Sequence, residues 1–513
     1  MFRATITTSI VAVLMAAGAA GLAGCQSGAG GASPTADNAV AEASGGGLPQ
    51  LETGTLAYAK GDYETAWRIL LPLAEAGDAT AQLYVSRLNY YGRGRRQDLA
   101  EAARWARLAA AQGDSDAQYA LGRMYDSGHG VDEDPAEAAR WYRLAAEQGH
   151  SGAQYTLAFL YKHGRGVPAD AAGELEWLQR AAQQGHADAQ YDLAILHEDG
   201  GLVARDEAAA ARWYRLAAEQ GHANAQIALG YLYDAGQGVE ADHQAAVYWY
   251  RQAAAQGNAQ AQHNLGVSYY WGEGVPQSDR EAAEWFLKAA EQGRAGSQVN
   301  IGYMYRSGRG VRRDYEEAMR WYRLAADQDE ETAQAELGHM YRQGEGVPQD
   351  YREAVRWYRM AAERGEPNAQ FALGYAYAFG EGVPQNGAEA VRWYRTAANQ
   401  GYVPAQFNLA IAYDNGVGVP RDHAEAARWF RRAAMQGNAG ALNNLALMYW
   451  HGEGVGQDRV MALALLNLAA ERGSDYARHN RVYYVAKMTS EEILKAEKLA
   501  EEWRRKIEGA GEL

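Results

Sequence analysis

Apolar residues recur along this chain at the spacing of two short amphipathic helices, and residues 115–150 show the pattern in full. Side chains three and four positions apart share one face of an α-helix. The apolar face of the first predicted helix consists of Ala117, Leu121, Gly122 and Tyr125. The apolar face of the second consists of Ala138, Trp141, Tyr142 and Ala145. The pattern therefore predicts a helical hairpin.

Glycine and capping residues mark the ends of these two helices. Gly128 and Gly130 permit the positive φ angles of a tight turn between them. Asp134 is a favourable N-cap, and Pro135 is a favourable first residue of the second helix. Gly149 can end that helix in the left-handed conformation. The sequence therefore predicts where each helix of the hairpin begins and ends, as well as which face is buried.

The hairpin pattern is repeated eleven times over residues 79–474. Its clearest marker is a tryptophan in the second helix, every 36 residues, at positions 105, 141, 177, 213, 249, 285, 321, 357, 393 and 429. We interpret this tryptophan ladder as core, because packing would demand the same ring in every copy. Each hairpin buries one face within itself and offers the other to its neighbour, so no copy could fold alone. We therefore predict one elongated all-α body.

The repeated motif is Ala-x-x-x-Leu-Gly-x-x-Tyr-x-x-Gly-x-Gly-Val, followed by Ala-x-x-Trp-Tyr-x-x-Ala-Ala-x-x-Gly. It closely resembles the Sel1-like repeat, a relative of the tetratricopeptide repeat. The resemblance implies a right-handed superhelical solenoid of stacked helix-turn-helix repeats that binds protein partners. Three departures stand out: Asp329 replaces a helix-ending glycine, Arg95 replaces the loop valine, and the fourth loop reads Gly-Gly-Leu-Val from Gly200.

The segments outside the repeats suggest an exported, anchored protein. Residues 1–24 have the pattern of an export signal, and they lead into Leu-Ala-Gly-Cys, which resembles a bacterial lipobox ending at Cys25. Because Cys25 is the only cysteine, we predict that it carries the lipid. Residues 25–50 are rich in Gly, Ala and Ser and are predicted to form a flexible linker. By family habit, Gln26 after the lipidated cysteine favours the outer membrane, facing the periplasm.

The two ends of the repeat array are predicted to be helical as well. Residues 51–78 are interpreted as a diverged N-terminal hairpin, in which Trp67 is offset from the tryptophan ladder by two residues. Residues 475–513 are interpreted as C-terminal capping helices, the last of them capped by Thr489 or Ser490.

Composition and motifs narrow the function. The net charge of −15 disfavours a sequence-independent hold on nucleic acid or an anionic bilayer. No Ser-x-x-Lys, Gly-x-Ser-x-Gly, His-Glu-x-x-His or Gly-Lys-Ser/Thr motif occurs. His150, His186 and His222 fall in one slot of successive copies, but stacked helices stand about 8 to 10 Å apart, too far to share a metal. We therefore predict no enzyme activity, no metal and no cofactor.

Outward positions of the first helix are the candidate partner-binding sites. In tetratricopeptide relatives these positions line a concave groove, and here many of them are aromatic. The candidates are Tyr155, Phe159, Tyr191, Tyr231, Tyr270, Trp271, Tyr303, Tyr375, Phe379 and Trp450. Trp271 and Trp450 stand outside the tryptophan ladder, which favours binding. The alternative is that many of these rings pack against neighbouring repeats.

A second ladder is basic. Arginine pairs such as Arg140 and Arg143 flank each tryptophan, and Glu137 and its equivalents lie three residues earlier, which predicts surface ion pairs. A denser arginine group is the one candidate polyanion site; it contains Arg306, Arg309, Arg312 and Arg313.

The function that we predict is a lipid-anchored periplasmic scaffold that binds protein partners in the cell envelope. A groove of aromatic rings would serve a glycan equally well. The alternative is therefore a polysaccharide-binding part of an exopolysaccharide export complex. An envelope hydrolase of the β-lactamase kind is a weaker alternative, because that branch of the family carries a cysteine pair in each repeat and this chain does not.

Overall fold

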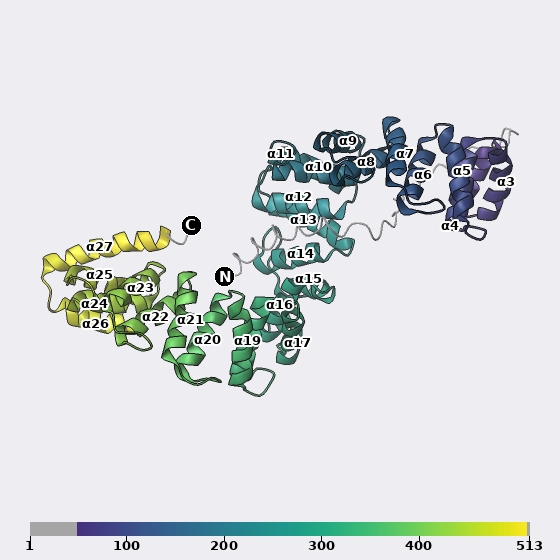
Figure 1. The fold of residues 1–513 in the computed structure, drawn as a ribbon. Coiled ribbons are helices and arrows are strands. Elements are labelled where there is room, and N and C mark those ends of the chain that lie inside the picture. Colours follow the sequence, from purple (N-terminus) through teal and green to yellow (C-terminus); the bar gives the residue numbers. More distant parts are fainter. Residues whose placement is uncertain (1–48, 510–513) are drawn as a thin grey trace. The chain divides into compact units, whose positions relative to one another are not determined.

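The structure is a computed structural model that describes residues 49–509, and every regular element in this range is an α-helix (Figure 1). The predicted export signal, the lipidation of Cys25 and nearly all of the linker lie outside the described residues. The chain divides into two compact units, Met1–Trp105 and Ala106–Leu513. Within residues 49–509 no helix is both long enough and apolar enough to cross a membrane.

The first unit contains a hairpin ahead of the repeats. The helices of this unit are α2 (Gln50–Ala59), α3 (Tyr63–Glu75) and α4 (Ala79–Tyr91), and α5 (Leu99–Ala111) crosses the boundary to the second unit. Helices α2 and α3 form the hairpin. Asp62 caps α3 by accepting a hydrogen bond from the Thr65 backbone N–H. Arg95, which replaces the usual loop valine, lies 3.7 Å from the ring centroid of Trp67. This cation–π contact gives the departure from the motif a structural reason.

The second unit alternates first and second helices. The first helices are α6 (Ser115–Ser127), α8 (Ser151–His163), α10 (Ala187–Asp199), α12 (Ala223–Ala235), α14 (Ala259–Trp271), α16 (Ala295–Ser307), α18 (Glu331–Gln343), α20 (Pro367–Phe379), α22 (Val403–Asn415) and α24 (Ala439–His451). The second helices are α7 (Pro135–Glu147), α9 (Ala171–Gln183), α11 (Glu207–Glu219), α13 (His243–Ala255), α15 (Asp279–Glu291), α17 (Tyr315–Ala326), α19 (Tyr351–Glu363), α21 (Gly387–Asn399), α23 (His423–Met435) and α25 (Arg459–Glu471). From α8 to α24, each first helix packs on the second helix before it and on the one after it, and α6 packs on α7.

The predicted caps and turns form as expected. Asp134 accepts hydrogen bonds from the backbone N–H groups of Ala136 and Glu137 at the start of α7. Gly128 ends α6 in the left-handed conformation. The second glycine of the loop is fixed by close approach as well, because a Cβ on Gly166 would lie 1.9 Å from a backbone oxygen of the preceding repeat. The Gly-x-Gly loop is therefore part of the stacking between repeats.

The ring that fills the centre of each hairpin is the one after the tryptophan. Tyr142 is almost completely buried, and a Cβ on Gly122 would lie 2.8 Å from its ring. The neighbouring Trp141 is only partly buried. Trp249 is also partly buried and packs against a cluster that includes Leu229 and helix α11 of the preceding repeat. The ladder is core as predicted, since Trp105, Trp177, Trp321 and Trp429 are buried and the partly buried Trp249 packs against the core cluster of the preceding repeat, but the tyrosine takes the centre of the hairpin.

A buried glutamine ladder, absent from the sequence-based predictions, also joins the helices. Gln154 donates from Nε2 to the Ala146 carbonyl oxygen (3.0 Å) at the end of the preceding second helix. Its Oε1 accepts from Nε2 of Gln184 (2.6 Å), the C-cap residue of the following second helix. One side chain thus satisfies buried polar groups on two neighbours. Equivalent pairs join Gln148 to Gln118, Gln220 to Gln190, Gln256 to Gln226, Gln292 to Gln262, Gln328 to Gln298, Gln400 to Gln370 and Gln436 to Gln406.

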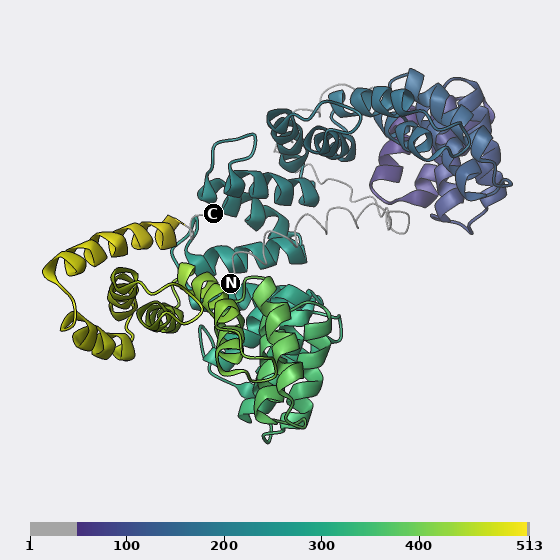
Figure 2. The same cartoon turned by 60° about the vertical axis from the view of Figure 1, so that its left-hand side comes forward.

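Two further helices, α26 (Asp475–Val485) and α27 (Ser490–Gly509), follow the last repeat. Thr489 caps α27, as one of the two predicted alternatives: its Oγ1 accepts from the Glu492 N–H, and Glu492 accepts from the Thr489 N–H (2.8 Å). Trp503 is buried where α27 packs along α25. Figure 2 shows α27 as the yellow helix at the C-terminal end of the described chain.

Candidate functional site

All ten candidate aromatic residues lie on first helices, and we call the surface formed by their positions the first-helix face. Phe379 is 63% exposed, Trp271 is 46% exposed and Phe159 is at the margin of exposure. The tyrosines are partly buried; they are Tyr155, Tyr191, Tyr231, Tyr270, Tyr303 and Tyr375. Trp450 is only 7% exposed, because its ring stacks on Tyr484 of α26 with 4.0 Å between centroids. Its ring is therefore not available to a partner, contrary to the sequence-based prediction.

The N-terminal candidates serve the packing of repeats. The Tyr155 hydroxyl donates to Asp192 Oδ2 (2.9 Å), and its ring stacks on His186 with 4.8 Å between centroids. Tyr191 stacks on His222 in the same way, at 4.6 Å. Both histidines are N-caps, since their Nδ1 atoms accept hydrogen bonds from backbone N–H groups at the starts of α10 and α12. His150 caps α8 likewise. These aromatic rings therefore fit the alternative prediction of packing between neighbours.

Trp271 belongs to a braced group of four residues, which we call the Trp271 platform. Its indole packs edge-on against Tyr270, with 5.0 Å between centroids and an interplanar angle of 83°. The Tyr270 hydroxyl accepts from Arg309, whose guanidinium carbon lies 4.4 Å from the same ring centroid. Arg309 in turn donates twice to Asp279, at 2.7 and 3.0 Å. The exposed indole is thus supported by a ring that a bidentate ion pair holds in place.

Phe379 is supported by a similar set of residues, which we call the Phe379 platform. Its ring lies 4.4 Å from that of Tyr375, centroid to centroid. The guanidinium carbon of Arg342 lies 4.7 Å from the Tyr375 ring centroid. Arg342 donates to both carboxylate oxygens of Glu381, at 2.8 and 3.3 Å. Two exposed rings, three repeats apart in the sequence, therefore share one design of aromatic ring, supporting tyrosine, arginine and carboxylate.

The candidate polyanion site does not form as four converging cations. Arg306 bridges Glu336 and Glu345 (2.6 Å), and Arg309 is held by Asp279. Burial raises the pKa of the Glu336 carboxyl even beside this arginine, and the charge of Glu345 adds to the effect. Two of the four arginines are thus already neutralised by carboxylates within the chain.

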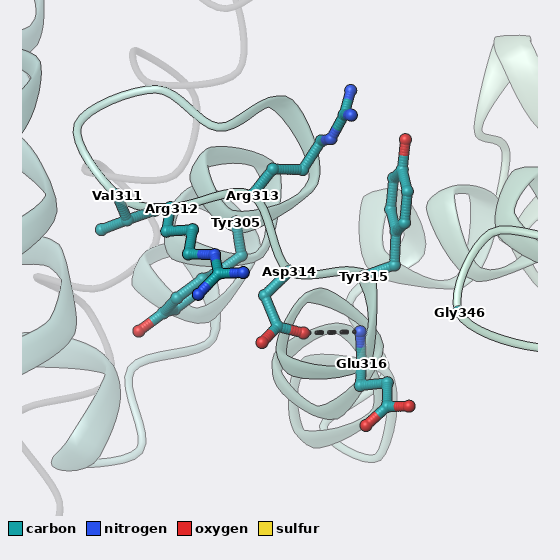
Figure 3. Close-up of a pocket in the computed structure, with 8 residues that line it drawn as sticks. All are labelled: Tyr305, Val311, Arg312, Arg313, Asp314, Tyr315, Glu316 and Gly346. Carbon is teal, nitrogen blue, oxygen red and sulfur yellow. Dashed lines mark hydrogen bonds between the residues drawn. The ribbon is translucent and has the colours of Figure 1, made fainter.

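The other two, Arg312 and Arg313, line a shallow pocket of about 740 Å³ after α16 (Figure 3). Figure 3 shows Arg313 and Tyr315 pointing away from the loop, while Asp314 accepts from the Glu316 N–H (3.0 Å). A pocket of about 850 Å³ occupies the equivalent loop after α12 and includes Val239. Because the pocket recurs with the repeat, it is a product of loop geometry.

The basic ladder of the second helices forms the predicted pairs. Arg140 lies 3.0 Å from Glu137, and equivalent pairs join Arg104 to Glu101, Arg320 to Glu317, Arg356 to Glu353, Arg392 to Glu389 and Arg428 to Glu425. The second arginine of each set was not explained by the sequence. Arg143 donates to the hydroxyl of Tyr161 in the next repeat (2.6 Å), and Arg251 does so to Tyr269 (2.9 Å). The arginine and the tyrosine are always 18 residues apart, and this constant separation in the sequence could have predicted the hydrogen bond.

Residues 49–509 contain no group of three or more His, Cys, Asp or Glu side chains that could hold a metal ion.

Comparison with known proteins gives the chain a family. The model of the Sel1 repeat matches residues 79–114, 115–150, 151–186, 187–222, 223–258, 259–293, 295–330, 332–366, 367–402, 403–438 and 439–474. A protective antigen of uropathogenic Escherichia coli strains, which displays an SLR fold, is 37% identical, with a TM-score of 0.77 over 85% of this chain and 94% of that one. A Sel1 repeat protein from Oxalobacter formigenes is 35% identical over 63% of this chain and 91% of its own, with a TM-score of 0.49. No curated protein matches. The eleven matches and the 37% identity over most of the chain show that this protein belongs to the Sel1 repeat family.

Proposed function

We propose that this protein is a lipid-anchored scaffold of the bacterial cell envelope, which binds protein partners through the first-helix face of its repeats. Sel1 repeat solenoids are typical of protein–protein interaction scaffolds. The proposal places the anchor at Cys25, in the outer membrane, and the repeats in the periplasm. It assigns no reaction to the chain. The observation that carries it is the pair of braced platforms at Trp271 and Phe379.

The platforms have the properties of interface anchors. Aromatic side chains dominate many interfaces because they bury a large area at a small cost in conformational entropy. The Trp271 and Phe379 rings already pack against tyrosines that ion pairs hold, so a partner would find them in place. Preorganisation of this kind lowers the free energy lost on binding.

Charged groups beside the rings offer directional contacts. Arg306, between the two platforms in the sequence, is about three-quarters buried, as is Glu336, so both side chains of this ion pair keep part of their surface exposed. Such paired groups can accept or donate hydrogen bonds to a peptide backbone at the rim of an apolar contact. The combination of exposed rings with paired charges is therefore suited to a protein segment that carries apolar anchors.

A crosslinking experiment tests the proposal in cells. A photo-reactive amino acid would replace Gln343, an exposed residue at the end of α18 that occupies the repeat position of Trp271 and Phe379. Crosslinked partners would be identified by mass spectrometry in the parent chain and in the Trp271→Ala and Phe379→Ala variants. Losing an anchor ring typically costs about 2 kcal/mol, or roughly thirtyfold in affinity, so we expect the crosslinked product to fall strongly.

The matched control is Tyr248→Ala. Tyr248 is as exposed as the platform rings but lies on the second helix α13, away from the first-helix face. This variant should keep the crosslinked product, and all three variants should keep their thermal melting. The proposal fails if the platform variants crosslink like the parent, or if they lose the product only because they unfold. A captured glycan in place of a protein would favour the polysaccharide alternative.

A further inference from the structure

Helix α26 occupies the place of a twelfth first helix. It follows α25 as each first helix follows a second helix, and it packs on α25. Ala477 and Tyr484 stand at the positions of Ala441 and Met448 in α24, and all four are buried. The Ser474 hydroxyl caps the helix by accepting from the Ala477 N–H (3.2 Å). One side of α26 therefore packs on α25, as a first helix packs on the second helix before it.

The other side of α26 is open. In the repeats, this side packs on the second helix of the same hairpin: Leu445 is fully buried there, and Ala446 beside it is too. The equivalent residues of α26 are Arg481, which is exposed, and Val482, which is 74% exposed. Tyr483, the next residue, is 57% exposed. A face that takes a helix in each repeat is thus left at the surface.

Helix α27 does not take the position of the missing second helix. Within residues 49–509 it packs mainly along α25 and also touches α23, which leaves the pairing face of α26 exposed. In Figure 1, α27 and α26 lie on opposite sides of α25. The face is the same kind of surface that accepts a helix elsewhere in the chain, so a helix is the ligand shape that fits it.

The open face is basic, although the chain as a whole carries a net charge of −15. Arg478, His479 and Arg481 are exposed on it, with Lys487 just beyond the end of the helix. Only Asp475, which lies 2.6 Å from Arg478, offsets these charges on the helix itself. Two copies of this face would repel each other, which argues against a symmetric dimer through α26.

We propose that an acidic amphipathic helix of a partner protein docks on this face of α26, in the place that a second helix takes in each repeat. Its carboxylates pair with Arg478 and Arg481, and its apolar stripe covers Val482 and Tyr483. Val482 stands where Gly122 and its equivalents receive an aromatic ring, so the docking helix presents aliphatic side chains at that point. This surface is separate from the platforms and does not depend on the function proposed for them.

Binding of a defined peptide tests the inference. The probe is a fluorescein-labelled synthetic helix of about 18 residues, long enough to be partly helical alone, with Leu and Ala on one face and Glu on the other. A second peptide has Lys in place of every Glu. Fluorescence anisotropy with the full chain should show saturable, salt-sensitive binding of the Glu peptide and at least tenfold weaker binding of the Lys peptide.

Variants locate the binding on α26. We expect Arg478→Glu with Arg481→Glu to weaken binding of the Glu peptide at least tenfold, and Val482→Asp to weaken it as well. The control is Arg356→Glu with Arg392→Glu, an equal charge change at exposed arginines of second helices. Melting should be nearly unchanged throughout, because the substituted side chains are exposed and the surface ion pairs that are lost contribute little.

Three outcomes would overturn the inference. They are the absence of saturable binding up to about 1 mM peptide, equal binding by the α26 variant and the parent, and loss of binding in Trp271→Ala with Phe379→Ala. The last result would place the peptide on the first-helix face. If the full chain forms a dimer that dissociates in the Arg478→Glu, Arg481→Glu variant, a second copy of the chain occupies the face and the proposed partner helix does not.

Discussion

Arg364 forms an ion pair with Asp329, and each of the two residues replaces one that the other repeats of this region share. Asp329 stands at a helix-ending glycine position with φ of 66°, and among residues 49–509 no other non-glycine residue has a positive φ. Arg364 stands where the neighbouring repeats have the glutamine of the buried ladder. Consequently Gln334 keeps a buried Oε1 without a hydrogen-bond partner. The two departures form one linked feature between successive repeats.

Restoring the ladder at this point should stabilise it. Arg364→Gln provides a donor for Gln334 Oε1, and satisfying a buried polar group contributes about 1 kcal/mol or more. The ion pair that is lost is largely exposed and contributes little. We expect slower hydrogen exchange in α18 and α19, measured by mass spectrometry.

The reverse change at the next repeat is the control. Gln400→Arg removes the donor that Gln370 Oε1 now has at 2.8 Å. Hydrogen exchange in α20 should then become faster, because the free energy of local opening falls by a similar amount. If Arg364→Gln speeds exchange in α18, the ion pair matters more than the orphaned amide oxygen.

Mild acid should weaken the middle of the array. His263 is buried, its Nδ1 lies 2.8 Å from Ser297 Oγ, and burial, together with the charge of Arg294, lowers its pKa to about 3. An unfolded histidine titrates near about 6.5, so unfolding takes up a proton below that pH and stability is lost as the pH falls from there toward 3. At about pH 5 the expected loss is about 2 kcal/mol relative to neutral pH.

His263→Asn isolates this effect. Asparagine occupies the equivalent position in α24, as Asn443, so the change introduces a residue that the repeat already uses. Hydrogen exchange of α14 and α16 should depend less on pH in the variant than in the parent between about pH 7.5 and about pH 5. An identical pH dependence in both proteins would assign the acid sensitivity to other groups, of which His339, with a pKa lowered to about 4 mainly by burial, is the next.

The helices of the repeats could be predicted well because each helix end is set by residues within a few positions of it. Asp134 and Gly128 act through backbone groups only a few residues away, so their roles could be predicted. The ring at the centre of the hairpin could not be chosen as reliably, since Trp141 and Tyr142 are adjacent and both aromatic. The signal was the opposing residue: Gly122 leaves room for a tyrosine ring.

The candidate site was predictable only in part for a related reason. Trp271 and Phe379 were singled out because they break the periodic pattern, and both rings are exposed in the structure. Their braces lie on neighbouring repeats, 39 residues from Tyr270 to Arg309 and from Arg342 to Glu381, and a search within one copy does not find them. Trp450 was misassigned because the covering helix α26 departs from the motif.

The division between central and seam rings has a measurable consequence. Tyr250→Ala should cost roughly 3 to 5 kcal/mol, because Tyr250 is buried and its hydroxyl donates to Asp234 (2.8 Å). The partly buried Trp249 should cost less when it is changed to alanine.

Urea unfolding gives the global cost, and hydrogen exchange shows where it falls. Both changes should open their own repeat and its neighbours first, since each repeat contacts only those beside it. A uniform rise of exchange along all repeats, or a larger cost for Trp249→Ala than for Tyr250→Ala, would contradict this account.

The predicted anchor is testable without knowledge of any partner. Cys25 completes the Leu-Ala-Gly-Cys motif and is the only cysteine of the chain, so Cys25→Ser removes the only thiol that could carry a lipid. A single acyl chain gives only marginal membrane binding, whereas two or more anchor a protein stably. If Cys25 carries the lipid that anchors the chain, removing it should release the protein from the membrane. We expect the parent chain in the membrane fraction after a salt wash and the variant in the soluble fraction. Gln26→Ala, a change at the next residue that keeps the thiol, is the control and should stay with the membranes. Should Cys25→Ser also remain there after the wash, the attachment would have to come from another part of the chain or from a bound partner, and the platform variants Trp271→Ala and Phe379→Ala in the same background would separate these two cases.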